Sequence, residues 1–100
     1  MATKDEAARF LGDTSSEQGF WLNNGPVLKN LEELSNALSQ ISKDAYGYHV
    51  NAEKNDFSKW VDDIIGDKKL ANDLLSSRNK ESAAKKVAAR VSSLKKKAGN

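Results

Sequence analysis

Residues 46–71 read YGYHVNAEKNDFSKWVDDIIGDKKLA, and this stretch decides the fold. Asn55 or Asp56 stands where the N-cap of a helix is expected. The apolar residues that follow lie on one helical face: Phe57, Trp60, Val61, Ile64 and Ile65. Gly66 can end this helix in the left-handed conformation, and Asp67 can cap the next one. The order of cap, apolar face, glycine and second cap predicts two consecutive helices.

Residues 30–42, NLEELSNALSQIS, have the clearest helical periodicity in the chain. Asn30 can cap this helix. Its apolar residues recur on one face: Leu31, Leu34, Leu38 and Ile41. A shorter helical candidate follows at residues 43–51, and Thr3 with Glu6 has the spacing of a capping box before a short N-terminal helix. We therefore predict helices on both sides of the opening stretch.

Residues 19–29, GFWLNNGPVLK, interrupt the helical pattern. The NNGP sequence is a turn signal flanked by apolar residues, so it predicts an extended segment or a small hairpin. A two-stranded hairpin alone is marginally stable. We therefore expect its aromatic residues to pack on helices, with Trp21 in the core as we also expect for Trp60.

Together these patterns predict an all-α fold, a small bundle of four to five short helices with one extended segment or small hairpin near residues 19–29. A chain of 100 residues makes one small domain at most. We divide it into an N-terminal helix and linker at residues 1–18, a helical core domain at residues 19–77, and a basic C-terminal helix or tail at residues 78–100.

Charge is unevenly distributed along the chain. Residues 1–77 carry 13 acidic and 8 basic residues, a net charge of −5, whereas residues 78–100 carry 8 basic residues and one glutamate, a net charge of +7. Cations that meet phosphates gain free energy from counterion release without any sequence code. We therefore predict a non-enzymatic binding module that contacts nucleic acid through its basic C-terminal helix. The candidate nucleic-acid-binding residues are Lys80, Lys85, Lys86, Arg90, Lys95, Lys96 and Lys97.

The alternative is a protein–protein interaction domain that uses the same helix. Its apolar residues form a narrow stripe: Ala84, Val87, Ala88, Val91 and Leu94. A protein partner could dock along this stripe. Because the stripe is thin and the lysines repel one another, we expect the helix to be frayed or detached until a partner neutralises its charge. Phosphate contacts weaken steeply with salt and apolar docking does not, so salt distinguishes the two hypotheses.

Residue types argue against catalysis and metal binding. His49 is the only histidine, and the chain has no cysteine, so a zinc site of the usual kind cannot form. No nucleophile stands beside His49 for acid–base chemistry, and residues 49–56 lack the pattern of a calcium loop. We therefore expect no metal, no cofactor and no enzymatic activity. His49 is interpreted as a bridge to the next helix start around Asn55 and Asp56, and an enzyme or ligand pocket around it is a third alternative.

Composition also bears on location. The absence of cysteine fits a reducing cytoplasm. No apolar run approaches the roughly 18 residues that a membrane span needs. Residues 1–20 lack the charged start and apolar block of a signal peptide. We therefore expect a cytoplasmic protein without a membrane partner.

The opening stretch also contains a set of residues at characteristic spacing: His49, Val50, Asn55, Asp56, Phe57, Trp60, Gly66, Asp67, Leu70 and Ala71. This set resembles a recurring signature of small prokaryotic proteins known only as a domain of unknown function. Gly25, Leu31 and Leu34 also match, so the resemblance covers about residues 20–76. It implies no activity, cofactor or partner. The N-terminal helix and the basic segment beyond residue 78 lie outside it.

Overall fold

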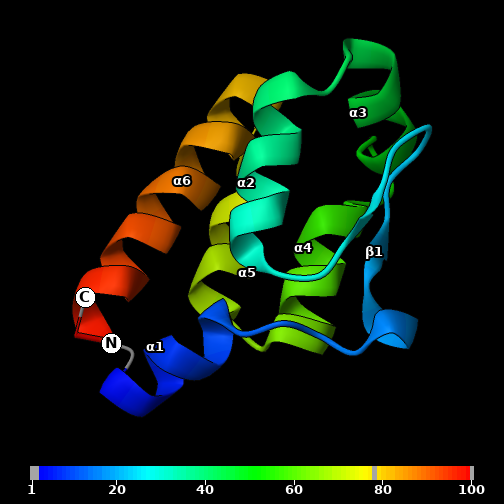
Figure 1. Ribbon diagram of the computed structural model, residues 1–100. Helices are drawn as coiled ribbons and strands as arrows, with labels where there is room; N and C mark the ends of the chain where they lie inside the picture. The colour runs from blue at the N-terminus through cyan, green and yellow to red at the C-terminus, as the bar shows by residue number, and fades with distance from the viewer. Residues whose placement is uncertain (1–2, 78, 100) are drawn as a thin grey trace.

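The structure, a computed structural model, describes residues 3–77 and 79–99. Six α-helices make up most of these residues, and the only sheet among them is a two-stranded hairpin (Figure 1). The predicted all-α class is therefore confirmed, with six helices instead of four to five. The elements are α1 (Lys4–Leu11), η1 (Ser16–Gln18), β1 (Phe20–Trp21), β2 (Val27–Leu28), α2 (Leu31–Gln40), α3 (Lys43–His49), α4 (Asp56–Trp60), η2 (Val61–Ile65), α5 (Lys68–Leu75) and α6 (Lys80–Lys97).

The helices begin where the sequence supplies a cap. Thr3 and Glu6 form both hydrogen bonds of a capping box at the start of α1. Asn30, Asn55 and Asp67 each accept the backbone N–H three residues further on, at 2.8, 3.0 and 3.2 Å. These side chains satisfy N–H groups that have no partner within a helix. The predicted starts of α1, α2, α4 and α5 are thereby confirmed.

The helix of the opening stretch changes winding before it ends. After α4 the chain continues into η2, a π-helical turn in which the Gly66 N–H donates to the Val61 carbonyl at 2.7 Å. Gly66 then adopts φ +89°, a left-handed conformation that residues with a side chain rarely adopt. The prediction that Gly66 ends this helix is confirmed, because its freedom at positive φ lets the chain turn into α5.

The hairpin is formed as predicted, but one of its aromatic residues is on the outside. Phe20 pairs with Leu28, and Trp21 pairs with Val27. Successive residues of a strand point to opposite faces. Phe20 is therefore 7% exposed, while Trp21 is 74% exposed. The expectation that Trp21 lies in the core is wrong, whereas Trp60 is buried as predicted.

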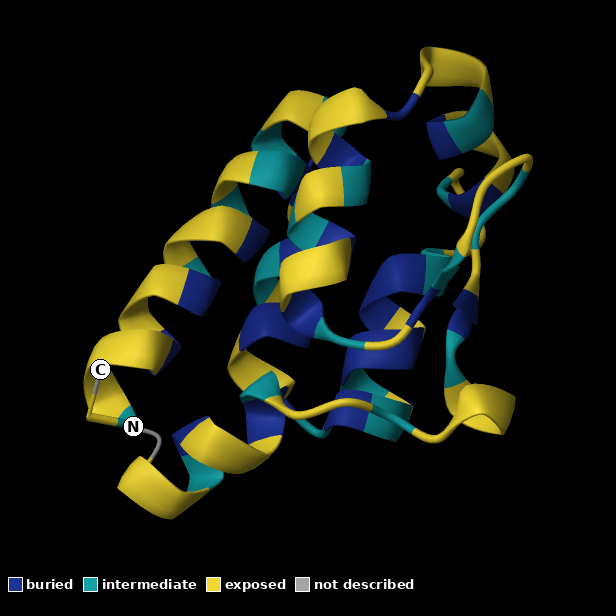
Figure 2. Ribbon diagram, viewed as in Figure 1, coloured by how far each residue is buried: buried dark blue, intermediate teal, exposed yellow. Residues whose placement is uncertain are grey.

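The basic helix α6 belongs to the core. It packs most extensively on α2 and also on α1 and α5, and its buried side faces the other helices (Figures 1 and 2). The buried residues of α6 are Ala83, Val87, Val91 and Leu94. The predicted stripe was displaced, because Ala84 is half-buried and Ala88 is exposed. The expectation of a frayed or detached helix is also wrong, because α6 is continuous and packed on its neighbours. Burying each of its valine and leucine side chains contributes about 1.5–3 kcal/mol.

The two tryptophans provide a matched test of this core. We expect Trp60→Ala to lower the free energy of unfolding by about 3–5 kcal/mol, because it removes a buried aromatic side chain. The same replacement at the exposed Trp21 should change it by about 0.5 kcal/mol or less. Urea unfolding of both variants measures the difference. Equal effects at the two positions would contradict the packing described here.

Candidate functional site

His49 connects the hairpin turn to the start of α4. Its side chain is buried, and its Nε2 atom accepts a hydrogen bond from the Asn23 backbone N–H at 3.0 Å. Its Nδ1 atom lies 3.0 Å from Asp56 Oδ2. A backbone N–H can only donate, so Nε2 carries no proton and Nδ1 donates to the carboxylate. The predicted bridge from His49 to the next helix start is confirmed.

Asp56 is held by two donors. Besides His49, Lys54 Nζ donates to the same Oδ2 atom at 3.0 Å. Partial burial acts to raise the pKa of Asp56, but the hydrogen bonds from His49 and Lys54 outweigh it and lower that pKa below its ordinary value. The His49 ring packs against both Phe20 and Phe57, with ring centroids 4.8 and 5.1 Å away, and these two phenylalanine rings also stack on each other. The atom that a general base would use, Nε2, is already engaged.

Other residues of the opening stretch also have structural contacts. Asn55 caps α4 and donates from Nδ2 to the Leu74 carbonyl at 3.1 Å. Ser58 Oγ donates to the Ala71 carbonyl at 2.8 Å, which ties α4 to α5. Trp60 Nε1 donates to the Gln18 carbonyl at 2.8 Å. This stretch holds α4, α5 and the segment before the hairpin together. Within the described residues, no group of three or more histidine, cysteine or acidic side chains could hold a metal ion.

Arg90, a predicted phosphate contact, forms a buried ion pair. Its Nε and Nη2 atoms donate to the two carboxylate oxygens of Asp67 at 2.7 and 3.0 Å. The Asp67 side chain is 1% exposed and that of Arg90 is 13% exposed. Such a two-point pair is strong and directional. The prediction that Arg90 contacts nucleic acid would require breaking this pair.

Two of the predicted phosphate-binding lysines bind the ends of other helices. Lys86 Nζ donates to the Asp73 carbonyl at 3.0 Å and to Ser76 Oγ at 3.2 Å, near the end of α5. Lys80 Nζ donates to the Ile41 carbonyl at 2.9 Å, just after α2. The last carbonyls of a helix have no partner within it and attract cations. These two lysines therefore attach α6 to its neighbours.

The remaining predicted cations are exposed. Lys95 pairs with Glu32 of α2 at 3.0 Å. Lys85 and Lys96 lie on the side of α6 away from the core, and Lys97 is also exposed. A shallow depression of about 520 Å³ lies on this side, lined by Ala89, Ser92, Ser93, Lys96 and Lys97. The structure thus divides the seven predicted residues into three half-buried ones that bind the body of the protein and four exposed ones, of which Lys95 also pairs with α2.

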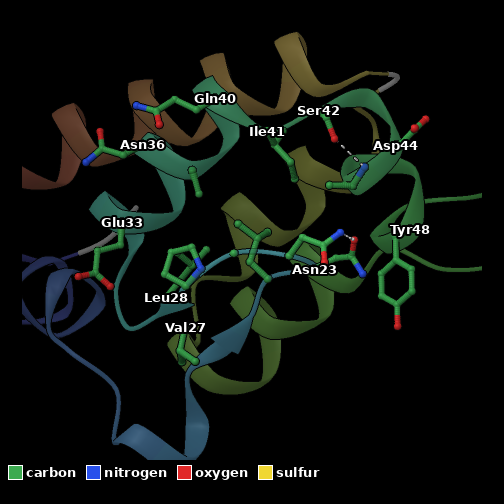
Figure 3. Close-up of a pocket in the computed structure, with 16 residues that line it drawn as sticks. Asn23, Val27, Leu28, Glu33, Asn36, Gln40, Ile41, Ser42, Asp44 and Tyr48 are labelled. Carbon is green, nitrogen blue, oxygen red and sulfur yellow. Dashed lines mark hydrogen bonds between the residues drawn. The ribbon is translucent and has the colours of Figure 1, made fainter.

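A larger groove, which the sequence analysis did not predict, lies between the hairpin and helices α2 and α3 (Figure 3). Its volume is about 810 Å³. Its apolar lining residues are Leu22, Pro26, Val27, Leu28, Ala37, Ile41 and Ala45. Its polar lining residues include Asn23, Asn24, Glu33, Asn36, Gln40, Ser42 and Asp44, and Tyr48 lies at one end. Among the described residues, two carboxylates and no cation line it.

Three polar side chains of the groove are exposed to solvent and have no protein partner in the described part of the chain. Within residues 3–77 and 79–99, the side-chain amides of Asn36 and Gln40 and the carboxylate of Asp44 form no hydrogen bond or ion pair. Glu33, by contrast, accepts the Lys29 N–H at 2.7 Å. Glu33, Asn36 and Gln40 recur at helical spacing beside the apolar face of α2. This spacing was visible in the sequence, but a solvated helix face has the same pattern.

Comparisons with known proteins add no identity. No protein-family model, curated protein or solved structure matches the chain. The resemblance to the domain of unknown function therefore stays a hypothesis. In the described part of the chain, no helix is long and apolar enough to cross a membrane.

The pair of Asp67 and Arg90 gives a prediction that distinguishes structural cations from exposed ones. Arg90→Ala should lower the free energy of unfolding by about 3–5 kcal/mol, because it leaves the buried Asp67 carboxylate without its partner. Lys85→Ala removes an exposed cation of the same helix and should change it by about 0.5 kcal/mol or less. Chemical denaturation measures both. An unchanged stability of the Arg90 variant would show that the ion pair does not hold α6 in place.

Proposed function

We propose that the protein is a non-enzymatic binding module whose groove between the hairpin and helices α2 and α3 takes a short peptide segment of another protein. The observation that carries this proposal is the groove itself, whose apolar floor lies beside the exposed amides of Asn36 and Gln40. Ligand sites in proteins are typically concave and apolar, with a few polar groups that fix orientation. Side-chain amides can both donate to and accept from a peptide backbone.

Charge narrows the class of peptide. Of the residues that the structure describes, the carboxylates of Glu33 and Asp44 and no cation line the groove. Asp44 has no partner in the described residues, so a lysine or arginine of the ligand can pair with it. The apolar floor calls for at least one apolar side chain. The expected ligand is therefore a segment that combines apolar and basic residues.

Peptide binding can be tested with fluorescent decapeptides that carry two central leucines flanked either by lysines or by glutamates. The lysine peptide should bind and the glutamate peptide should not. Removing each amide, in Asn36→Ala and Gln40→Ala, should cost about 1 kcal/mol of binding free energy, which weakens affinity roughly fivefold per variant. Fluorescence anisotropy measures these affinities.

Asn72→Ala is the matched control, because it removes an exposed amide of α5 outside the groove. It should leave affinity unchanged. Equal binding of both peptides, or equal loss in all three variants, would argue against the groove as the site.

Nucleic-acid binding is the second candidate function, supported by the exposed face of α6. Lys85 and Lys96 lie there, and the residues between them that line the depression are small or hydroxylated. A flat surface of this kind lets a phosphate backbone approach closely, and serine hydroxyls and lysines both donate to phosphates. The phosphate-binding set is narrower than the sequence indicated, because Lys80, Lys86 and Arg90 bind the body of the protein.

The number of exposed cations on α6 sets the expected salt dependence. With two to four phosphate contacts from Lys85, Lys95, Lys96 and Lys97, the slope of log K against log salt on duplex DNA should be about −2 to −4. The double variant Lys85→Ala/Lys96→Ala should lose most of the binding. Lys43→Ala, which removes an exposed lysine of α3, is the matched control and should not. Gel-shift titrations at two salt concentrations measure the slope, and an absence of binding at low salt would remove this candidate.

A further inference from the structure

The hydrogen bond between His49 and the hairpin turn holds one residue of the groove wall, Asn23. Asn23 lines the groove, and its backbone N–H donates to His49 Nε2 at 3.0 Å. The turn itself is closed by a different bond, from the Gly25 N–H to the Leu22 carbonyl at 3.1 Å. Within the described residues His49 is therefore the one partner of the Asn23 N–H.

We propose that protonation of His49 releases the hairpin turn at residues 22–25 and thereby changes the wall of the groove. The protonated imidazole carries a proton on both ring nitrogens. Nε2 would then be a donor that faces the Asn23 N–H, another donor, at 3.0 Å. Two donors at this distance repel each other, so the neutral ring and the closed turn require each other.

The turn is the side of this contact that moves. The His49 ring is fixed by Phe20 and Phe57 and by the Asp56 carboxylate. Protonation strengthens the contact with Asp56, since it becomes an ion pair. The turn has less to hold it: β1 and β2 contain two residues each, and residues 24–26 are exposed.

The charged and titratable groups around His49 are few. Asp56 of α4 contacts its Nδ1 atom, and Lys54 of the preceding loop pairs with the same carboxylate. Tyr48 of α3 lies edge-on to the His49 ring, with centroids at 5.0 Å, and Lys54 Nζ lies 5.3 Å from the Tyr48 ring centroid. Within the described residues, no other ionisable side chain forms a hydrogen bond, ion pair or ring contact with His49.

Peptide binding in the groove and protonation of His49 are therefore thermodynamically coupled. A peptide that needs the closed turn binds the neutral form of His49 better, so its affinity falls as pH falls. By the same linkage, a bound peptide makes His49 harder to protonate. This pH dependence rests on the proposed function, but the response of the turn in the free protein does not.

The test is a titration of the free protein by ¹⁵N NMR between pH 7.5 and 5. The ring nitrogens of neutral His49 should show the proton on Nδ1. The backbone amides of residues 22–25 should shift with the same midpoint as the His49 ring, while those of the α2–α6 interface should not. A proton on Nε2 at high pH, or turn amides that do not follow the ring, would overturn the proposal.

The variant His49→Gln provides the control. Its side-chain oxygen can accept the Asn23 N–H as Nε2 does, and it does not titrate. The amides of the turn should then keep their high-pH positions down to pH 5. If they still titrate as in the wild type, another group moves the turn and the proposal is wrong.

A second measurement separates this proposal from the proposed function. Between pH 7.5 and 5, the lysine decapeptide should lose affinity for the wild type and keep it for His49→Gln. If the turn follows His49 but no peptide binds at any pH, the proposed function fails and the proton-dependent turn stands. If peptide binds with the same pH dependence to both proteins, His49 does not control the groove.

Discussion

The Asp67 carboxylate is nearly excluded from water, so it depends on hydrogen-bond donors from two helices, α5 and α6. It caps α5 through the Leu70 N–H and pairs with Arg90 through both oxygens. A buried carboxylate that lost either partner would cost several kcal/mol, so the start of α5 and the middle of α6 are held at one point. Gly66 brings Asp67 to this position at the end of η2. The turn between two helices thereby determines where the basic helix lies.

This constraint explains why charge was a poor guide to the role of α6. The sequence shows many cations in a short segment, and counting them predicts a phosphate-binding tail. Three of them are instead needed inside the molecule, where Arg90 neutralises Asp67 and Lys80 and Lys86 satisfy carbonyls at the ends of α2 and α5. Their partners lie 39, 13 and 23 residues away in sequence for Lys80, Lys86 and Arg90. No local pattern indicates pairs at such separations.

Local features, by contrast, were predictable. Caps, apolar faces and the terminating glycine depend on residues within one or two turns, so the helix starts and Gly66 followed from the sequence. The hairpin was also predicted, because NNGP is a turn signal. The exposure of Trp21 was not predictable. A hairpin of two-residue strands has two faces, and the sequence does not indicate which face packs on the helices. The groove was missed for a related reason: it exists only where residues 22–28 approach residues 33–48.

His49 has both a contact that is near in sequence, with Asp56, and a contact that is distant in sequence, with Asn23. A phenylalanine in place of His49 could still pack against Phe20 and Phe57, but it would leave the Asn23 N–H without its acceptor and Asp56 without one of its donors. An unsatisfied polar group costs about 1–3 kcal/mol when buried. The imidazole supplies one acceptor and one donor in a fixed geometry, and this geometry exists only in the neutral ring. The residue that attaches the hairpin to α4 is thus also the residue through which a proton can act on the wall of the groove.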